Sequence, residues 1–120
     1  MLPIQLYQQI HLIAILMVFF ALGATMVLSL SGATLKKVRV LGAVTHGVGL
    51  VLVLVSGFGM LARMGGGFPG WVIVKLGVWV LLGGALVAAK RLHASMGAVF
   101  WWGLILLGAI AIHMVILKPF

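Results

Sequence analysis

The chain has 120 residues, of which 65% are apolar, with eight Lys or Arg and no Asp or Glu. Its charged fraction of 7% excludes an ordinary soluble domain, in which about 25% of residues are charged. The lack of Asp, Glu and Cys excludes side-chain carboxylate chemistry, disulfides and thiolate metal sites. The basic residues stand at the ends of apolar runs, which favours contact with lipid phosphates over nucleic acid.

Four apolar runs are long enough to cross a bilayer, whose core of about 30 Å needs about 20 residues of helix. They predict helices over residues 4–30, 38–64, 71–89 and 96–117. The connections are short and are polar or rich in Gly and Pro, so consecutive helices should be antiparallel neighbours. The predicted fold class is all-α integral membrane: a single domain, residues 1–120, forming an up-down-up-down four-helix bundle with the first helix beside the fourth.

The basic residues are divided unequally between the two ends of this bundle. Three belong to the end that carries the chain termini: Arg63, Lys75 and Lys118. Five belong to the opposite end: Lys36, Lys37, Arg39, Lys90 and Arg91. Because Lys and Arg favour the cytoplasmic side, this excess predicts a multi-pass membrane protein with both termini outside. The first run lacks a basic n-region and is expected to be a retained helix.

Glycines recur along one side of the second predicted helix. Gly42, Gly49 and Gly57 follow near-helical spacing. Small residues let helix backbones approach closely in a membrane. This side is therefore expected to be a protein interface and not a lipid-facing surface.

Polar residues inside the apolar runs are candidates for a functional site, because ionisable groups are costly in lipid. A rise of 1.5 Å per residue puts His11, His113 and Lys75 about 10, 8 and 6 Å in from the end that carries the termini. Tyr7 lies one turn from His11 on the same face. We expect these residues to form one site. His46 lies about 12 Å in from the opposite end and is expected to serve helix packing.

Two interpretations of these residues stay open. Each His could simply hydrogen-bond a neighbouring helix, and Lys75 could extend to the membrane interface. Alternatively, His11 and His113 could be ligands to the iron of a b-type haem, with Lys75 or Arg63 pairing with its propionates. A quinone headgroup would use the same His and Lys side chains, whereas a structural zinc site would need three or four ligands.

Three segments resemble the HemJ-type protoporphyrinogen oxidases and the SirB-like proteins, which are small bacterial four-helix membrane proteins. YQQIHLIAI (7–15) is similar to their Tyr-x₃-His opening, and GWVIVKLGVWVLL (70–82) to the Trp-x₃-Lys-Leu run of their third helix. HGVGLVLVLVSGFGM (46–60) resembles the His-led second helix of SirB-like proteins. The HemJ resemblance implies that His11 and Lys75 are a functional pair acting on a porphyrin with bound b haem. The Gly-Leu-Phe-Tyr-Leu-Pro-Arg-Leu stretch of HemJ proteins is replaced by MVFFALGATMVLSL (17–30), so enzymatic activity stays open.

The expected function is binding of haem b, a related porphyrin or a quinone between the helices, on the side of the termini. The alternative is a non-catalytic accessory or structural subunit of a larger energy-transducing membrane complex. The missing carboxylates and short loops favour this alternative. Expected partners are the lipid bilayer and either other membrane subunits or further copies of the chain, with no nucleic acid.

Overall fold

The computed structural model describes residues 3–32, 34–65, 67, 69–92 and 94–117. The long helices are α1 (Ile4–Ser31), α2 (Lys36–Met64), α3 (Gly70–Lys90) and α4 (Gly97–Leu117), and a 3-10 turn, η1 (Ala94–Met96), precedes α4. All four are long and apolar enough to cross a membrane. The predicted spans are confirmed to within two residues at every end. Lys118 lies outside the described residues.

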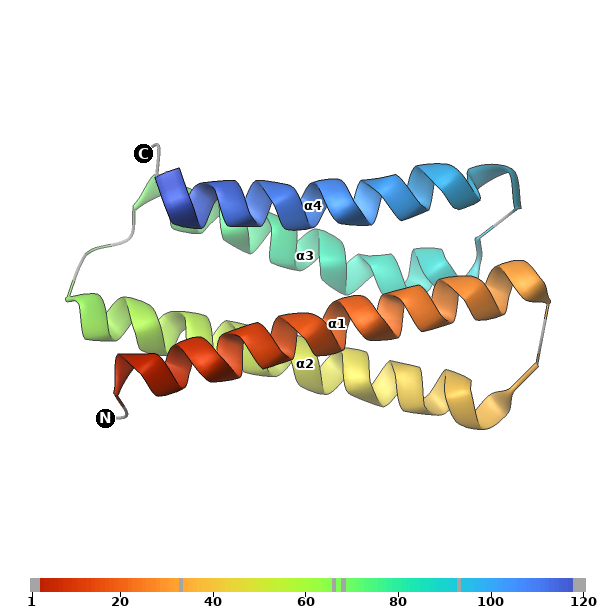
Figure 1. Cartoon of the computed structure of the whole chain (residues 1–120), viewed down its shortest axis with the longest axis horizontal. Coiled ribbons are helices and arrows are strands. Elements are labelled where there is room, and N and C mark those ends of the chain that lie inside the picture. The colour runs from red at the N-terminus through yellow and green to blue at the C-terminus, as the bar shows by residue number, and fades with distance from the viewer. Residues whose placement is uncertain (1–2, 33, 66, 68, 93, 118–120) are drawn as a thin grey trace.

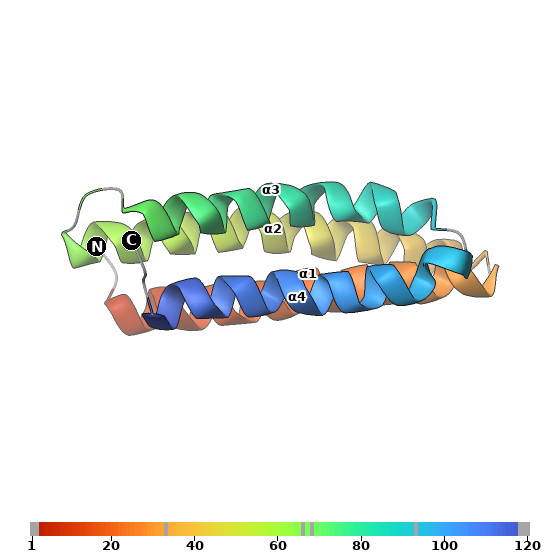
Figure 2. The same cartoon turned by 90° about the horizontal axis from the view of Figure 1, so that it is seen from above.

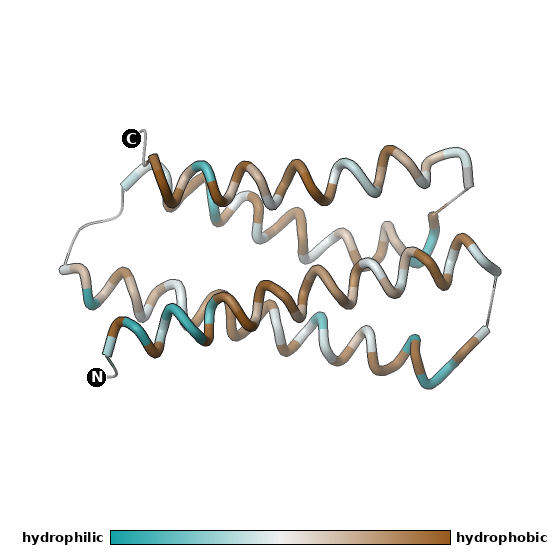
Figure 3. The backbone as a smooth tube through the Cα atoms, viewed as in Figure 1, coloured by the Kyte–Doolittle hydropathy of each residue, from teal (hydrophilic) through white to brown (hydrophobic). Residues whose placement is uncertain are grey.

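The helices lie side by side along the long axis of the molecule (Figure 1). A view turned by 90° shows α1 and α4 in one layer and α2 and α3 in the other (Figure 2). The beginning of α1 and the end of α4 lie at the same end of the bundle (Figure 1). Hydrophilic residues gather mainly near the two ends, and the helices between are largely apolar (Figure 3).

Two glycines end the first two helices. Gly32, with φ 71°, follows α1, and Gly65, with φ 67°, follows α2. Both occupy the left-handed region, which glycine adopts without the steric cost of a Cβ. Their backbone N–H groups donate to Ser29 and Ala62, so each cap closes its helix.

Helices α1 and α2 form the most extensively packed pair. The buried residues of α1 that recur at alternating intervals of three and four are His11, Ala14, Val18, Ala21, Thr25 and Leu28. The buried residues of α2 fit the same repeat: Gly42, His46, Gly49 and Ser56. An average repeat of 3.5 residues is typical of left-handed knobs-into-holes packing. We call this contact the α1–α2 seam.

Glycines of α2 let its backbone approach α1 closely along the seam. A Cβ added at Gly49 would lie 2.9 Å from Val18 Cγ2 and 3.1 Å from the carbonyl oxygen of Ala14. A Cβ at Gly42 would lie 3.2 Å from Thr25 Oγ1. The expectation that the glycine side of α2 is a protein interface is confirmed, and its partner is α1.

The hydrophobic core lies where α1 meets α3 and α4. Its buried members are Val18, Leu22, Val78, Leu82 and Leu104. Among the described residues, Leu104 is the one buried core member that α4 contributes. In the apolar 18-residue stretch of α4, 6% of the residues are buried, compared with 39% in that of α1. Helix α4 nevertheless contacts α1, because Gly97 lies against Leu30 and Gly108 against Phe19. The bundle is therefore tight at the seam and loose at α4.

Two side-chain hydrogen bonds join α2 to α3. His46 Nε2 lies 3.0 Å from the carbonyl oxygen of Leu82, to which it donates, and Trp79 Nε1 donates to the carbonyl oxygen of Leu50 at 2.9 Å. His46 is buried, with 2% of its surface exposed. As expected from the sequence, His46 serves helix packing.

Removing these links is expected to loosen α3 from α2. His46→Ala and Trp79→Phe should each lower the free energy of unfolding by about 1 kcal/mol, the size of an interhelical hydrogen bond in a membrane protein. Denaturation in detergent, followed by circular dichroism, measures the change. Trp102→Phe is the matched control, since Trp102 is 66% exposed. If Trp102→Phe lowered the free energy of unfolding by the same amount, the two hydrogen bonds would make no specific contribution to stability.

Candidate functional site

His11 lies in the α1–α2 seam with 8% of its surface exposed. Its Nδ1 is 3.1 Å from the carbonyl oxygen of Val53 and 2.9 Å from Ser56 Oγ. Gly57 lies against the ring, because a Cβ added there would be in ordinary contact with it, 3.4 Å from His11 Cε1. Helix α2 therefore holds the His11 ring from one side and fixes its direction.

The hydrogen-bond partners of His11 indicate which of its two ring nitrogens carries the proton. Ser56 Oγ donates to the carbonyl oxygen of Leu52 at 2.6 Å, so toward His11 this oxygen acts as an acceptor. The carbonyl oxygen of Val53 can only accept. Nδ1 is therefore the donor to both, and in a neutral ring with this tautomer Nε2 carries the free lone pair.

The Nε2 atom of His11 belongs to the accessible surface. Both hydrogen bonds of His11 use Nδ1. Over the part of the chain that the structure describes, no fully buried side-chain nitrogen or oxygen lacks a hydrogen-bond partner. An Nδ1–H bonded to a backbone carbonyl beside a free Nε2 is the arrangement that orients histidines as metal ligands.

Two further predicted site residues lie around His11. Lys75, on α3, is partly buried, and its charge is within electrostatic reach of the His11 ring. The chain contains no Asp or Glu that could neutralise it. Tyr7 lies one turn before His11, and its ring packs directly on the backbone of Gly59. The structure thus brings together polar groups from α1, α2 and α3 near the end that carries the termini.

His113 does not join this cluster. It is exposed, as are Trp102 and Leu106 on the same face of α4. Most residues of α4 that pack on the core lie on the other face, namely Phe100, Leu104, Leu107 and Ala111, whereas Ile110 lies between the two faces. His113 follows Ala111 by two residues and so points about 200° away around the helix. Within a single chain the structure therefore does not bring His113 and His11 together, although they lie at matched depth: matched depth does not imply matched direction.

The described residues hold no group of three or more His, Cys, Asp or Glu side chains that could bind a metal ion. The charge of Lys75 is within electrostatic reach of His11, and no group of further ligands accompanies that imidazole among the described residues. This donor set suits a group that takes one ligand from the protein and has its own negative charge.

Ser56 is the residue of this cluster that sequence reasoning did not select. It is 1% exposed and accepts from His11. The signal was present: Ser56 follows Gly49 by seven residues, as Gly49 follows Gly42. Extending the glycine repeat by one heptad would have put Ser56 in the seam.

The comparisons with known proteins assign no family to the chain. Compared with protein-family models, with curated proteins and with solved structures, the chain matches none. The similarity to HemJ-type and SirB-like proteins therefore stays a prediction from the three segments that carry it.

Proposed function

We propose that this chain is a multi-pass protein of the bacterial cytoplasmic membrane that holds a b-type haem, a related porphyrin or a quinone at His11. Four candidate spans support the membrane assignment. The short connections support an up-down-up-down bundle, and the basic excess at the end with Lys36 and Lys90 supports an orientation with both termini outside. The observation that carries the proposal is the accessible Nε2 of His11, oriented by Val53 and Ser56 beside Lys75.

The donor set fits a haem that takes one iron ligand from this chain. His11 Nε2 would be that ligand, and Lys75 would pair with a propionate. Haem iron would supply reversible one-electron chemistry. With His113 on the outer face of α4, a second axial ligand would not come from this residue of the same chain. A quinone also fits this site, because Lys75 can donate to a quinone carbonyl oxygen and Nε2 can accept from a hydroxyl of the reduced quinol form.

The protein's contribution in either case is positioning. The seam fixes the His11 ring through two hydrogen bonds to α2, so the direction of Nε2 is set before a ligand enters. Lys75 supplies positive charge in a part of the membrane where no side-chain carboxylate is available to neutralise it. An anionic or electron-rich ligand group is thus favoured at this position.

The absorption spectrum of protein purified from haem-replete cells tests this proposal. A Soret band at one equivalent per chain or per dimer supports haem or porphyrin. Colourless protein from which solvent extracts one equivalent of quinone supports the quinone form. Colourless protein without quinone would overturn the proposal.

The second candidate is a non-catalytic accessory subunit, and the loose attachment of α4 favours it. The outer face of α4 carries Trp102, Leu106 and His113, all exposed. In a complex this face would contact another membrane subunit. Purification in mild detergent tests it: stoichiometric partner subunits, lost when Leu106→Trp is introduced, would support this role.

The orientation is tested by cysteine labelling, since the chain has no native Cys. Thr34 and Gly67 are exposed in the connections at opposite ends of the bundle. In intact cells an impermeant maleimide is expected to label Gly67→Cys and not Thr34→Cys, whereas lysed cells should label both. The reverse pattern would invert the orientation.

A further inference from the structure

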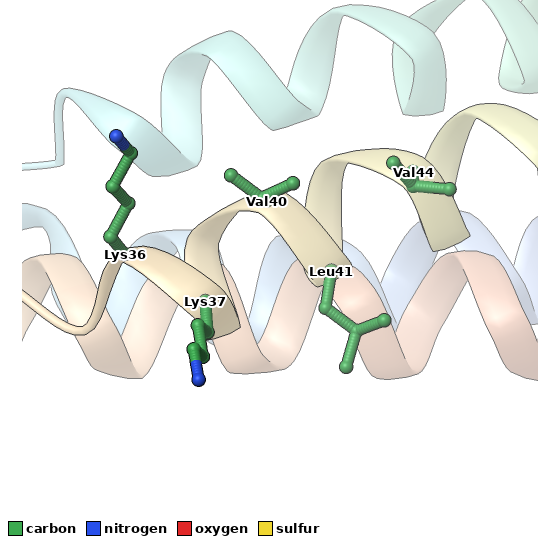
Figure 4. A pocket seen from close by; sticks show the side chains of 5 residues that line it. All are labelled: Lys36, Lys37, Val40, Leu41 and Val44. Carbon is green, nitrogen blue, oxygen red and sulfur yellow. The ribbon is translucent and has the colours of Figure 1, made fainter.

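The outer face at the beginning of α2 carries a shallow hollow of about 650 Å³. It is lined by Lys36, Lys37, Val40, Leu41 and Val44 (Figure 4). The two lysine side chains diverge at the start of the helix, and the three apolar side chains continue along it (Figure 4). The surface of the hollow is almost entirely apolar, so the two lysines line it with their aliphatic stems, and their ammonium groups point away from each other (Figure 4).

This face is directed away from the rest of the bundle. Its five residues share one side of α2, and Gly42 and Gly49, which meet α1, lie on the other. Val40, Leu41 and Val44 are 53%, 67% and 56% exposed. In a membrane-spanning helix such a surface faces lipid unless another chain covers it.

The charge of this face is uncompensated. Lys36 and Lys37 begin α2, Arg39 follows them, and no acidic residue lies in the first turn. Elsewhere in the chain there is no Asp or Glu either. A ligand for this face should therefore bring negative charge to the lysines and apolar surface to the valines.

We infer that this face binds an anionic phospholipid, with an acyl chain along Val40, Leu41 and Val44. The phosphate would lie at the level of Lys36 and Lys37, whose flexible stems let the ammonium groups turn toward it. From Lys36 to Val44 the helix rises about 12 Å, which spans the passage from headgroup to hydrocarbon. A free phosphate would leave the apolar floor unused. A second copy of the chain, packed face to face, would put lysines against lysines.

Lipid retention by delipidated protein in detergent, measured by native mass spectrometry, tests this site. One phosphatidylglycerol should be retained more tightly than phosphatidylcholine of the same acyl composition. Lys36→Gln with Lys37→Gln should weaken this retention about thirtyfold, since each lysine near an anionic surface contributes a factor of about five. Lys90→Gln with Arg91→Gln is the matched control. It removes two exposed charges at the same end, from the last residue of α3 and the residue that follows it, and should leave retention near the wild-type level.

Several results would overturn the site. Equal retention of the two lipids by the unaltered protein would do so without any variant. So would equal weakening by the control pair, or displacement of the lipid by inorganic phosphate at matched concentration. A lipid-independent dimer that disappears with the Lys36 and Lys37 substitutions would assign the face to a second copy instead.

Discussion

Gly49→Leu is expected to lower the free energy of unfolding of the bundle by about 3 kcal/mol, the upper end of the usual cost of overpacking. An added Cβ would lie 2.9 Å from Val18 Cγ2, 3.1 Å from the backbone oxygen of Ala14 and 3.2 Å from Met17 Cβ. None of these atoms is the far end of a flexible side chain. Helices α1 and α2 would have to separate, which also loosens His11 from Ser56.

Gly47→Leu is the matched control for this substitution. Gly47 lies on the same helix, is exposed, and has no atom within 4 Å of an added Cβ. Its replacement should change stability by less than about 0.5 kcal/mol, as surface substitutions usually do. Unfolding in detergent, followed by circular dichroism, compares the two variants. Equal stability of Gly49→Leu and Gly47→Leu would contradict the close seam.

Helix positions were readable from the sequence because bilayer thickness sets the length of an apolar run. The largest difference is at α2, which begins at Lys36 and not at residue 38. Two lysines were assigned to the preceding connection because they are charged. They nevertheless begin the helix, since lysine can keep its stem on the helix and extend its ammonium group to the membrane interface.

The direction of side chains was less predictable than their depth. In a soluble helix, apolar residues mark the interior face, but α1 and α4 are apolar all round, so hydropathy does not distinguish lipid from protein. Small residues gave the better signal: Gly42 and Gly49 identified the interface of α2 correctly. Helix α4 has no such repeat at His113, and the grouping of that residue with His11 rests on shared depth and on the expected packing of the first helix beside the fourth.

The α1–α2 seam explains why His11 is a stronger candidate for a ligand-binding residue than His113. It is buried, and its two hydrogen-bond partners, Val53 and Ser56, belong to the neighbouring helix. His46 has one comparable bond, to Leu82, in the other half of the bundle. Replacing either residue should affect packing, so a test of ligand binding at His11 has to separate packing from binding.

His11→Asn makes this separation, because the amide nitrogen of Asn can occupy the place of Nδ1 and donate to Val53 and Ser56, while nothing replaces Nε2. The variant is expected to keep stability close to the wild type and to lose the Soret band, or the bound quinone, almost completely. His11→Ala should lose both ligand and stability.

Three further variants complete the series, measured by absorption or quinone extraction alongside detergent unfolding. Ser56→Ala should weaken retention of the bound group about tenfold, as loss of a hydrogen bond to a metal-ligating His does. His46→Ala should reduce stability but retain the group, and His113→Ala should change neither, since its ring lies on the outer face of α4. Full retention by His11→Asn, or loss caused by His113→Ala, would remove His11 Nε2 from the site.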